Sequence, residues 1–577
     1  MSPAPAAARP RRGAAWALFA LAGGAVWGLA FGREPWVVAS WLALAPLFPL
    51  LGAPGGRRWT FVLGFLHGLA AWIVAIPWIV PTLRSYGELP VWLAWISLFI
   101  LAGYLALYHG AFAVLGRPLW RWAVGEVAIV VARSGPGGAP SGERRHSRDG
   151  RGAVPPRRER ARTGAGLRRL LHVARSRRPR TAPPPALRAA VALVGLPSLW
   201  GFLEWIRTWL FGGFPWNPAG HAWLEVPGAL PTAAYIGVYG VGAMLVLANA
   251  GVALAVVRRR WVWGAAAVLS VLAVLGAGVR WGDGGAADPH RSAFGTAGEP
   301  VRMLQPNIPN AVRPDWETIE ANYRHVLELS EAACEPGALL VWPESAAWPY
   351  TFADDPGFRR DVLGLAARGG CTVLFNSIQP AGERYYNSAY VVRPDGASAR
   401  YDKRHLVPFG EYVPLAGVFA WLDKLARNAG DFLAAEDVAL LPWRDERLGM
   451  SICYEIVFPA EVAEAVRAGA TILVTITNDA WYGDTAAPWQ HYAAARFRAA
   501  ESRRPLLRAA ITGVSALVAP DGAELARLDP FVEGLIRGRV EGERQLSPYT
   551  RRPWVVPVVA ALLAAAALGV CALSLRS

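Results

Sequence analysis

The chain has 577 residues, which is too long for one ordinary domain. Hydrophobic residues make up 54% of it and 27 residues are Trp, a composition that favours a membrane protein with interfacial aromatic side chains over a soluble one. The net charge of +16 does not indicate nucleic-acid binding. Residues 133–188 alone hold 16 Arg and three acidic residues, and the rest of the chain is nearly neutral. This segment has neither the interleaved aromatic residues nor the folded domain with which proteins recognise nucleic acids.

Apolar stretches long enough to cross a bilayer, about 20 residues each, predict eight membrane spans. The first span follows three arginines and could be a cleaved signal peptide, but it lacks a clear small-residue cleavage site and a second span follows directly. The predicted spans are 14–31, 36–52, 59–81, 90–115, 189–211, 229–257, 261–280 and 554–575.

Basic loops predict the orientation of these spans. If the N-terminus is cytoplasmic, the arginines at 57–58, 133–188 and 258–260 all fall on the cytoplasmic side. Residues 281–553 then lie on the extracytoplasmic side of the membrane, and both termini are cytoplasmic. Residues 119–132 are apolar but short and charged, so we interpret them as an interfacial or partly buried helix; a crossing there would reverse the placement of 281–553.

Residues 133–188 are rich in Arg, Pro and Gly and cannot bury a core, so we expect them to be disordered. They are interpreted as an insertion or as a reading-frame artefact of a GC-rich gene. Contact with anionic lipids and the absence of any function are both compatible with this composition.

Glu204 and Arg207 lie within the fifth predicted span, three residues apart on one helical face. Charges inside a membrane are costly and commonly functional, but a structural pair near the outer interface is at least as compatible with this spacing. The loop that follows, residues 212–218, would face the extracytoplasmic region and is a candidate wall of a lipid access path.

From about residue 300 the pattern changes to short apolar runs separated by helical and turn segments, which predicts an α/β domain with two sheets. Residues 412–443 are apolar with little strand pattern, and they predict either a membrane-dipping lid or ordinary packing. The predicted strands are 301–305, 338–342, 372–377, 388–393, 447–453, 471–477 and 506–518.

Three stretches of this region carry candidate catalytic groups. Cys453 ends an apolar strand just before a polar turn, where a nucleophile is expected, although most lone cysteines are inert core residues. Glu344 follows an apolar run and a Pro, so poor solvation would raise its pKa towards the range of a general acid or base. Lys403 would favour a thiolate and stabilise an oxyanion, with Glu411 as its partner. Taken singly, each charged residue is more typical of a protein surface than of a catalytic site.

Together these stretches resemble the nitrilase (carbon-nitrogen hydrolase) superfamily and, within it, the apolipoprotein N-acyltransferase family. The motifs that carry the resemblance are Lys-Arg-His-Leu-Val-Pro-Phe-Gly-Glu-Tyr-Val-Pro at 403–414, Cys-Tyr-Glu at 453–455, Thr-Asn-Asp-Ala-Trp-Tyr-Gly at 477–483 and Pro-Trp-Gln-His at 488–491. One departure is at 508–513, where the family pattern leads us to expect an Asn at or just before Thr512.

The resemblance implies a catalytic triad and supporting residues. Glu344 would be the general acid and base, Lys403 the oxyanion stabiliser and Cys453 the nucleophile, supported by Glu411, Tyr454 and Glu455. The implied substrates are a phospholipid acyl donor and the N-terminal diacylglyceryl-cysteine amine of apolipoproteins, joined through a thioester on the cysteine. No metal or cofactor is expected.

The implied architecture is a polytopic helical membrane domain of about eight spans with an α-β-β-α sandwich. Its expected parts are seven spans in 1–280, the sandwich in 298–548 and one span in 554–575. The four cysteines show no paired or metal-like spacing, so we expect neither a disulfide framework nor a zinc site. His491 is expected to be structural, because Lys403 and Glu344 already fill the roles that a histidine would take.

Two other functions share some of these features. A membrane-tethered amidase of the nitrilase type would use the same triad with water as acceptor, but it has no need of eight apolar helices. A membrane scaffold with a decayed enzyme domain would not need an intact set of Glu, Lys and Cys.

Overall fold

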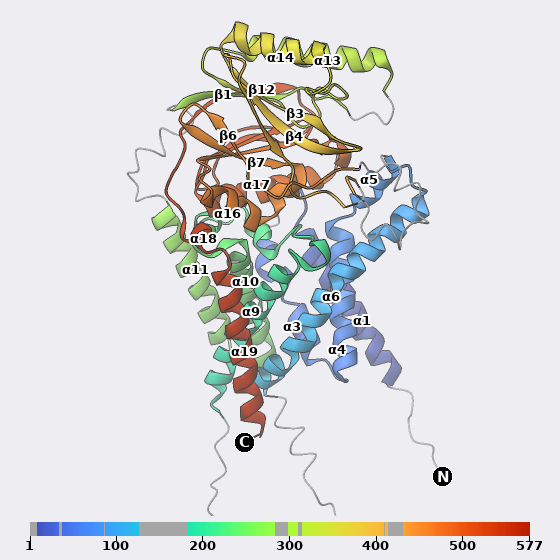
Figure 1. Ribbon diagram of the computed structural model, residues 1–577. Coiled ribbons are helices and arrows are strands. Elements are labelled where there is room, and N and C mark those ends of the chain that lie inside the picture. Colours follow the sequence, from blue (N-terminus) through green and yellow to red (C-terminus); the bar gives the residue numbers. More distant parts are fainter. Residues whose placement is uncertain are drawn as a thin grey trace, which may run out of the picture.

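The computed structural model describes residues 9–33, 37–85, 87–125, 183–282, 298–309, 314–408, 410–412 and 431–576. The predictions for most of the Arg-rich segment 133–188, and for the part of the 412–443 loop between 413 and 430, lie outside these residues. Within them, the chain forms a bundle of apolar helices that carries an α/β domain at one end (Figure 1).

The helical domain combines the N-terminal half of the chain with the C-terminal helix. Among the described residues, six of its helices are long and apolar enough to cross a membrane: α4, α6, α9, α10, α11 and α19. The elements are α1 (Arg9–Leu29), α2 (Val37–Ala43), α3 (Leu47–Gly52), α4 (Arg57–Ala75), α5 (Ile79–Ser85), α6 (Val91–Val124), α9 (Pro185–Ile206), η1 (Leu210–Gly212), η2 (Ala219–Trp223), α10 (Ala229–Arg258), α11 (Val262–Gly282) and α19 (Val555–Arg576).

The predicted count of eight spans is not confirmed, because the first two predicted spans form shorter apolar helices. These are Gly13–Leu29 within α1 and the stretch Val38–Gly52. The second stretch is divided into α2 and α3, and Pro46 occupies the N-cap of α3. A proline has no backbone N–H to donate to the preceding turn, and it is tolerated at the start of a helix, where that donor would be unpaired.

Helix α6 is longer than the predicted fourth span. It continues through Pro118 to Val124 and ends at Gly125, which has a φ of 88°. Leu119 and Trp120 are buried in it. The separate interfacial helix predicted from residue 119 is therefore, as far as 124, the last part of α6.

The α/β domain contains two six-stranded sheets, in the orders β12-β1-β2-β3-β4-β5 and β11-β10-β9-β8-β7-β6. Parallel pairs form the centre of each sheet, and antiparallel strands lie at the edges. The strands are β1 (Glu299–Gln305), β2 (Leu339–Val341), β3 (Thr372–Ala381), β4 (Arg384–Val392), β5 (Ser398–Asp402), β6 (Leu440–Trp443), β7 (Glu446–Ile452), β8 (Ile472–Thr477), β9 (Leu506–Ala510), β10 (Ser515–Val518), β11 (Glu524–Leu528) and β12 (Gly534–Val540).

All seven apolar runs predicted as strands contain strands, and the run 506–518 is a hairpin of two, β9 and β10. The sequence prediction missed β5, β6, β11 and β12. All four lie at the edges of the sheets, and β11 carries exposed polar residues that hide the strand pattern.

Helices cover both outer faces of the paired sheets (Figure 1), which confirms the predicted α-β-β-α sandwich. Helices α13 (Trp316–Ala333) and α14 (Pro356–Gly369) form the layer farthest from the helical domain. Helices α16 (Pro459–Arg467) and α17 (Ala487–Ser502) lie between the second sheet and the helical domain. The N-cap side chains Asp315 and Asp355 accept backbone N–H groups and so fix where α13 and α14 begin.

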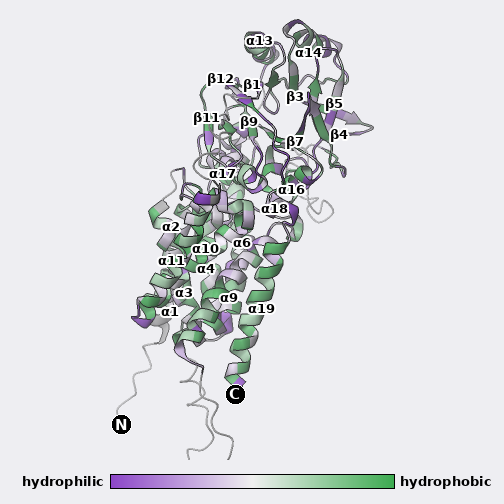
Figure 2. Cartoon of the chain, turned by 90° about the vertical axis from the view of Figure 1, so that its left-hand side faces the viewer, coloured by the Kyte–Doolittle hydropathy of each residue, from purple (hydrophilic) through white to green (hydrophobic). Residues whose placement is uncertain are grey.

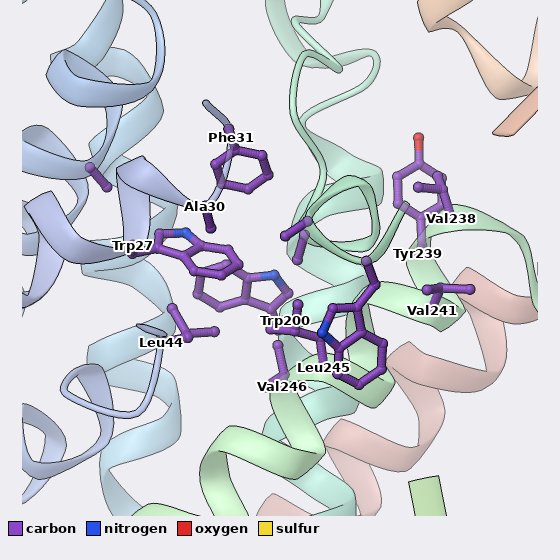
Figure 3. Close-up of a cluster of buried hydrophobic side chains, with 14 of the residues drawn as sticks. Trp27, Ala30, Phe31, Leu44, Trp200, Val238, Tyr239, Val241, Leu245 and Val246 are labelled. Atoms are coloured by element: carbon purple, nitrogen blue, oxygen red, sulfur yellow. The ribbon is translucent and has the colours of Figure 1, made fainter. Parts of the chain in front are cut away.

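The two domains share an apolar core at their contact, while two further buried clusters belong to the sandwich alone. A single cluster of buried side chains runs from the membrane helices into the α16 and α17 layer, where it includes Tyr454, Phe458 and Phe497. Figure 2 shows the strongly hydrophobic helices of the helical domain below the more polar sandwich. In Figure 3, Trp27 and Phe31 of the N-terminal segment point towards Trp200 of α9. The sandwich is therefore packed onto the helical domain rather than tethered by a loop.

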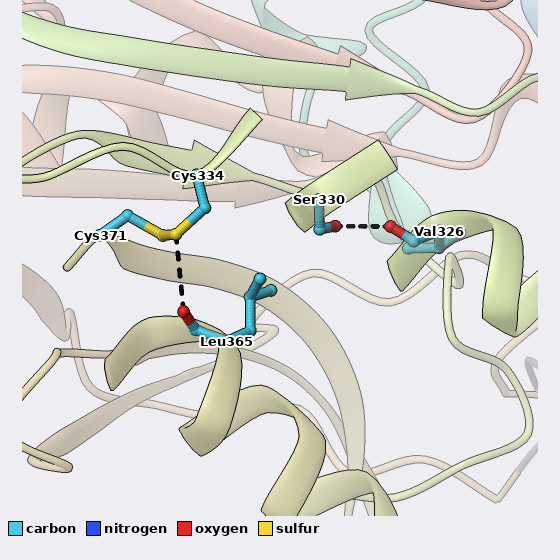
Figure 4. The surroundings of a disulfide bond; sticks show 5 residues. All are labelled: Val326, Ser330, Cys334, Leu365 and Cys371. Atoms are coloured by element: carbon cyan, nitrogen blue, oxygen red, sulfur yellow. Dashed lines mark hydrogen bonds between the residues drawn. A yellow bond between two sulfur atoms is a disulfide. The ribbon is translucent and has the colours of Figure 1, made fainter. Parts of the chain in front are cut away.

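The expectation of no disulfide framework is wrong, because Cys334 and Cys371 form a disulfide bond with a Cα–Cα distance of 5.6 Å (Figure 4). The two residues are 37 positions apart and so show no local pattern in the sequence. Cys334 ends α13 and Cys371 precedes β3, and the parallel pairing of β2 with β3 brings their flanking segments together. Gly337 N donates to Gly370 O at 2.7 Å beside the bond.

Candidate functional site

The three candidate catalytic residues follow the ends of three strands. Cys453 comes directly after β7 and Lys403 directly after β5, while Glu344 lies three residues beyond β2. Strands β2 and β5 belong to one sheet and β7 to the other, so the site lies between the two sheets at their strand ends. All three side chains are buried, with exposed fractions of 7% or less.

A tight turn presents Cys453. It is the first residue of a short 3-10 helix, η4 (Cys453–Val457), and its φ of 55° lies in the left-handed region that non-glycine residues rarely adopt. Such backbone strain persists only where the surrounding contacts determine the conformation. Two residues supply these contacts, Glu455 within the turn and His491 below it.

Glu455 ties the cysteine turn to the lysine segment. Its Oε2 accepts the Ile452 N–H at 2.7 Å, and its Oε1 accepts from the Tyr401 hydroxyl at 2.9 Å and from Arg404 N and His405 N at 2.6 and 3.1 Å. Burial raises the pKa of Glu455 to about 7, although Lys403 and the donated N–H groups favour the charged form. Its role is to fix the spacing between the nucleophile and the lysine.

A compact polar network joins Lys403 to the two other carboxylates. Lys403 Nζ lies 2.9 Å from Glu411 Oε1, and Val407 N donates to the second oxygen of Glu411 at 2.8 Å. Asn387 of β4 donates through one Nδ2 to both Glu411 and Glu344, at 2.9 and 3.1 Å. The other oxygen of Glu344 accepts the Asn478 N–H at 2.9 Å. Each acid therefore has a fixed orientation.

The surroundings of Glu344 and Lys403 raise the pKa of both side chains, for different reasons. Burial raises the pKa of Glu344, and the charge of Glu411 adds to this, while Lys403 and hydrogen bonds from Asn387 and Asn478 oppose it. Burial alone would lower the pKa of Lys403, but the surrounding charges, first that of Glu411 and then that of Glu344, outweigh it and raise the pKa. The lysine therefore stays charged, and the protonated form of Glu344 is favoured more than it is for an exposed glutamate.

The Cys453 thiol is protonated in the resting site. Burial raises its pKa, and the nearby charge of Glu344 raises it further, whereas Lys403 lowers it. A thiol in this state needs a base before it can attack a carbonyl. Glu344 is the candidate, because its charge acts on the thiol and its pKa is raised, whereas Glu455, whose pKa is also raised, is held by four hydrogen bonds.

His491 contacts the backbone of Cys453. Its Nε2 lies 3.0 Å from the carbonyl oxygen of Cys453, and its Nδ1 lies 2.9 Å from Asp479 Oδ1. Asp479 also receives Arg508 Nη2 at 2.7 Å and the Thr477 hydroxyl at 2.7 Å. These charges hold the pKa of Asp479 near 2 despite burial. This geometry agrees with the structural role expected for His491, because its hydrogen bond is to the carbonyl of Cys453.

The helical domain forms one side of the site. Trp216, in the loop after α9, stacks on Tyr454 with ring centroids 6.4 Å apart and an interplanar angle of 17°. Arg207 donates to the Trp216 carbonyl at 2.9 Å and lies 3.8 Å from Glu204, whose Oε1 accepts the Ala219 N–H at 2.7 Å. The buried pair of Glu204 in α9 and Arg207 at its C-cap thus holds the 212–218 loop against the sandwich.

Sequence reasoning missed some residues that complete the network. Asn387 lies in a strand among apolar and aromatic residues, and a lone amide in such a run was the available signal. Asn376 contacts the site only through tertiary packing, which no local pattern reveals. Gln490 falls within the motif at 488–491, but its contact with Trp216 could not be inferred from it. Thr477 and Asp479 fall within a motif already noted in the sequence, but their contacts with His491 and Arg508 could not be inferred from it.

Comparison with known proteins agrees with this arrangement. The sequence model of the family described as "Carbon-nitrogen hydrolase" matches residues 301–545, and that described as "Apolipoprotein N-acyltransferase N-terminal domain" matches residues 23–133 and 165–251. Apolipoprotein N-acyltransferase of Geobacter metallireducens is 32% identical over 553 residues, covering 92% of this chain and 91% of the relative. That of Ralstonia nicotianae is 32% identical over 538 residues, covering 91% and 87%.

Among solved structures, a CN-hydrolase superfamily protein from Xanthomonas campestris covers 45% of this chain and 96% of its own, with 18% identity and a TM-score of 0.34. The sandwich and its family match define a membrane protein with a carbon-nitrogen hydrolase domain. The chain belongs to the apolipoprotein N-acyltransferase family, and it is an N-acyltransferase.

Proposed function

We propose that the protein moves a fatty acyl chain from a membrane phospholipid, through a thioester on Cys453, to the N-terminal diacylglyceryl-cysteine amine of apolipoproteins. The observation that carries the proposal is the position of the buried cysteine between two environments. It adjoins the polar network of Glu344, Lys403 and Glu411, and the next residue, Tyr454, packs on Trp216 of the helical domain. In this proposal the apolar side of the site takes the lipid acyl chain and the charged side carries out the acyl transfer.

In the first half-reaction, the Cys453 thiol loses its proton to Glu344 and its sulfur attacks the ester carbonyl of the phospholipid. The Lys403 ammonium and backbone N–H groups stabilise the oxyanion that forms. The intermediate collapses by breaking the ester C–O bond, and Glu344 returns the proton to the departing lysophospholipid oxygen. The acyl chain remains as a thioester.

In the second half-reaction, the amine of the acceptor attacks the thioester carbonyl. Glu344 takes a proton from the amine, the C–S bond breaks, and the proton returns to the cysteine sulfur. The product is an amide, and the enzyme regains its thiol. A raised pKa of Glu344 suits both halves, because the same group must release and accept a proton near neutral pH.

We further propose that residues 298–548 form the catalytic domain and face the extracytoplasmic side of the inner membrane, with both termini in the cytoplasm. Two observations support this orientation. The disulfide between Cys334 and Cys371 is typical of an oxidising compartment. The start of α1 and the end of α19 both lie at the end of the helical bundle away from the sandwich (Figure 1).

The test is the intact mass of the full-length protein after incubation with a bacterial phospholipid extract and no acceptor. A fatty-acyl increment that hydroxylamine releases is expected on the parent. It is also expected on Cys571→Ala, which removes the other free cysteine, a buried residue of α19. Cys453→Ala should show no increment. An acyl label that persists on Cys453→Ala would remove this residue as the nucleophile.

A further inference from the structure

Gln490 lies at the contact between the two domains, in the first turn of α17, and is 5% exposed. Its side-chain amide makes four hydrogen bonds, all to the helical domain. Nε2 donates to Phe31 O at 2.8 Å and to Ala75 O at 2.7 Å. Oε1 accepts the indole N–H groups of Trp78 at 3.0 Å and of Trp216 at 2.7 Å.

These four partners determine the orientation of the amide. Indole nitrogens can only donate and backbone carbonyls can only accept, so only one assignment of the amide oxygen and nitrogen satisfies all four. The partners come from the end of α1, the end of α4, the segment before α5 and the loop after α9. A single side chain of the sandwich thus joins three separate segments of the helical domain: the end of α1, the connection between α4 and α5, and the loop after α9.

The next residue connects this junction to the nucleophile. His491 Nε2 faces the Cys453 carbonyl at 3.0 Å, and its ring lies over Trp216 with centroids 5.5 Å apart. Cys453 has a φ of 55°, a conformation that depends on its surrounding contacts. A displacement of the first turn of α17 would therefore move the hydrogen-bond donor that holds the strained turn.

We infer that Gln490 is a positioning residue that makes the geometry of Cys453 depend on the docking of the sandwich against the helical domain. The inference rests on the proposed role of Cys453 as nucleophile. It explains why a buried amide with no contact to the reacting groups makes every hydrogen bond of which its side chain is capable. The nucleophile would be correctly held only where the membrane domain is in place.

Two variants test this in the full-length protein, and a third serves as control. Trp78→Phe removes one donor to Gln490 and keeps an aromatic ring. Gln490→Leu removes all four bonds. The matched control is Tyr235→Phe, which removes the hydrogen bond of 2.9 Å that Arg503 donates to the Tyr235 hydroxyl, between α17 and α10 at the other end of α17.

The first readout is single-turnover acylation by a bacterial phospholipid extract, with rate constant and amplitude measured separately. We expect the rate constant to fall about threefold in Trp78→Phe and about tenfold or more in Gln490→Leu, because small displacements of a reacting group cost much of the rate. Tyr235→Phe should stay within about twofold of the parent. A role in folding alone would lower the amplitude and leave the rate constant of the remaining folded molecules unchanged.

The second readout is alkylation of Cys453 by iodoacetamide as a function of pH, located by peptide mass. Loosening of the turn should admit water, so the midpoint should move to lower pH in Trp78→Phe and Gln490→Leu but not in Tyr235→Phe. An unchanged rate constant and midpoint in folded Trp78→Phe would overturn the inference. If the parent forms no acyl adduct, the proposed function fails, and the alkylation midpoints still decide the role of Gln490.

Discussion

Asn387 donates a hydrogen bond of 3.1 Å to Glu344, and the same Nδ2 lies 2.9 Å from Oε1 of Glu411. One amide thus orients two acids that have different environments. Glu411 forms an ion pair with the Lys403 ammonium at 2.9 Å, whereas burial and the charge of Glu411 raise the pKa of Glu344. A carboxyl group whose surroundings raise its pKa in this way suits the role of a proton carrier.

Replacement of the bridging amide should disturb both acids. In Asn387→Leu, Glu344 and Glu411 both lose the hydrogen bond from Asn387 Nδ2, so the amide no longer offsets the repulsion between the two carboxylates. We expect the acyl-transfer rate constant to fall about 10- to 100-fold. Gln379→Leu is the matched control, because Gln379 is a partly buried amide on the adjacent strand β3 that contacts Tyr390 rather than the site. A parent-like rate in Asn387→Leu would show that the acids need no bridge.

The charge of Glu344 should have opposite effects on two reactions of Cys453. Because this charge raises the pKa of the thiol, Glu344→Gln should lower that pKa, by about one unit. The variant should then react with iodoacetamide about tenfold faster near neutral pH, since more of the cysteine is thiolate. Acyl transfer from phospholipid should nevertheless fall by about 100-fold or more, because the proton carrier is missing.

The measurement is the pH profile of Cys453 alkylation beside the acylation rate constant for the same preparation. In the parent, alkylation should still be rising at pH values above the ordinary thiol pKa, because the Cys453 pKa is raised. If the pH midpoint of alkylation in Glu344→Gln lies at the parent value or above it, the charge of Glu344 does not raise the pKa of Cys453.

The Lys403 ammonium should affect the pKa of the Cys453 thiol in the direction opposite to that of Glu344. It lowers the pKa of Cys453, so Lys403→Met should shift the alkylation profile to higher pH. Loss of oxyanion stabilisation should reduce acyl transfer about 100- to 1,000-fold. Arg400→Gln is the control, since it removes an exposed cation whose ion pair with Asp402 lies on the preceding strand β5. Full acyl transfer in Lys403→Met would refute the role assigned to the lysine.

Most of the sandwich could be predicted from the sequence because its central strands are buried on both faces. Such strands appear as continuous apolar runs, and all seven predicted runs contain strands. Strand β11 has only partly buried and exposed residues, so its composition does not distinguish it from a loop. The hairpin at 506–518 was predicted as one strand, because both of its strands and the turn between them are buried.

The candidate site was predictable to the extent that it follows strand ends. Glu344, Lys403 and Cys453 each come after a strand, and the resemblance placed them in one site. Asn387 and Gln490 were not predictable in this way, because their contacts join residues that are far apart in the chain. Hydrogen bonds across a domain interface leave no periodic signal in a sequence.

The disulfide gives a test of both stability and orientation. It closes a loop of 37 residues between the end of α13 and the start of β3, in the outer part of the sandwich. In the chain-entropy description, such a cross-link contributes about 2–4 kcal/mol. The double variant Cys334→Ala/Cys371→Ala should therefore unfold at a temperature about 5–15 °C lower, with an acylation rate constant close to that of the parent at low temperature.

The state of these cysteines in the cell follows from the side of the membrane on which the sandwich folds. Of the four cysteines, only Cys453 and Cys571 are free, so the denatured parent should take up two alkyl groups without a reductant and four after reduction. Protein taken directly from cells into acid and then alkylated should show the same pair of values, because an oxidising compartment preserves the bond. Four groups without reduction would place the sandwich in a reducing compartment and contradict the extracytoplasmic orientation, whatever the activity of the site.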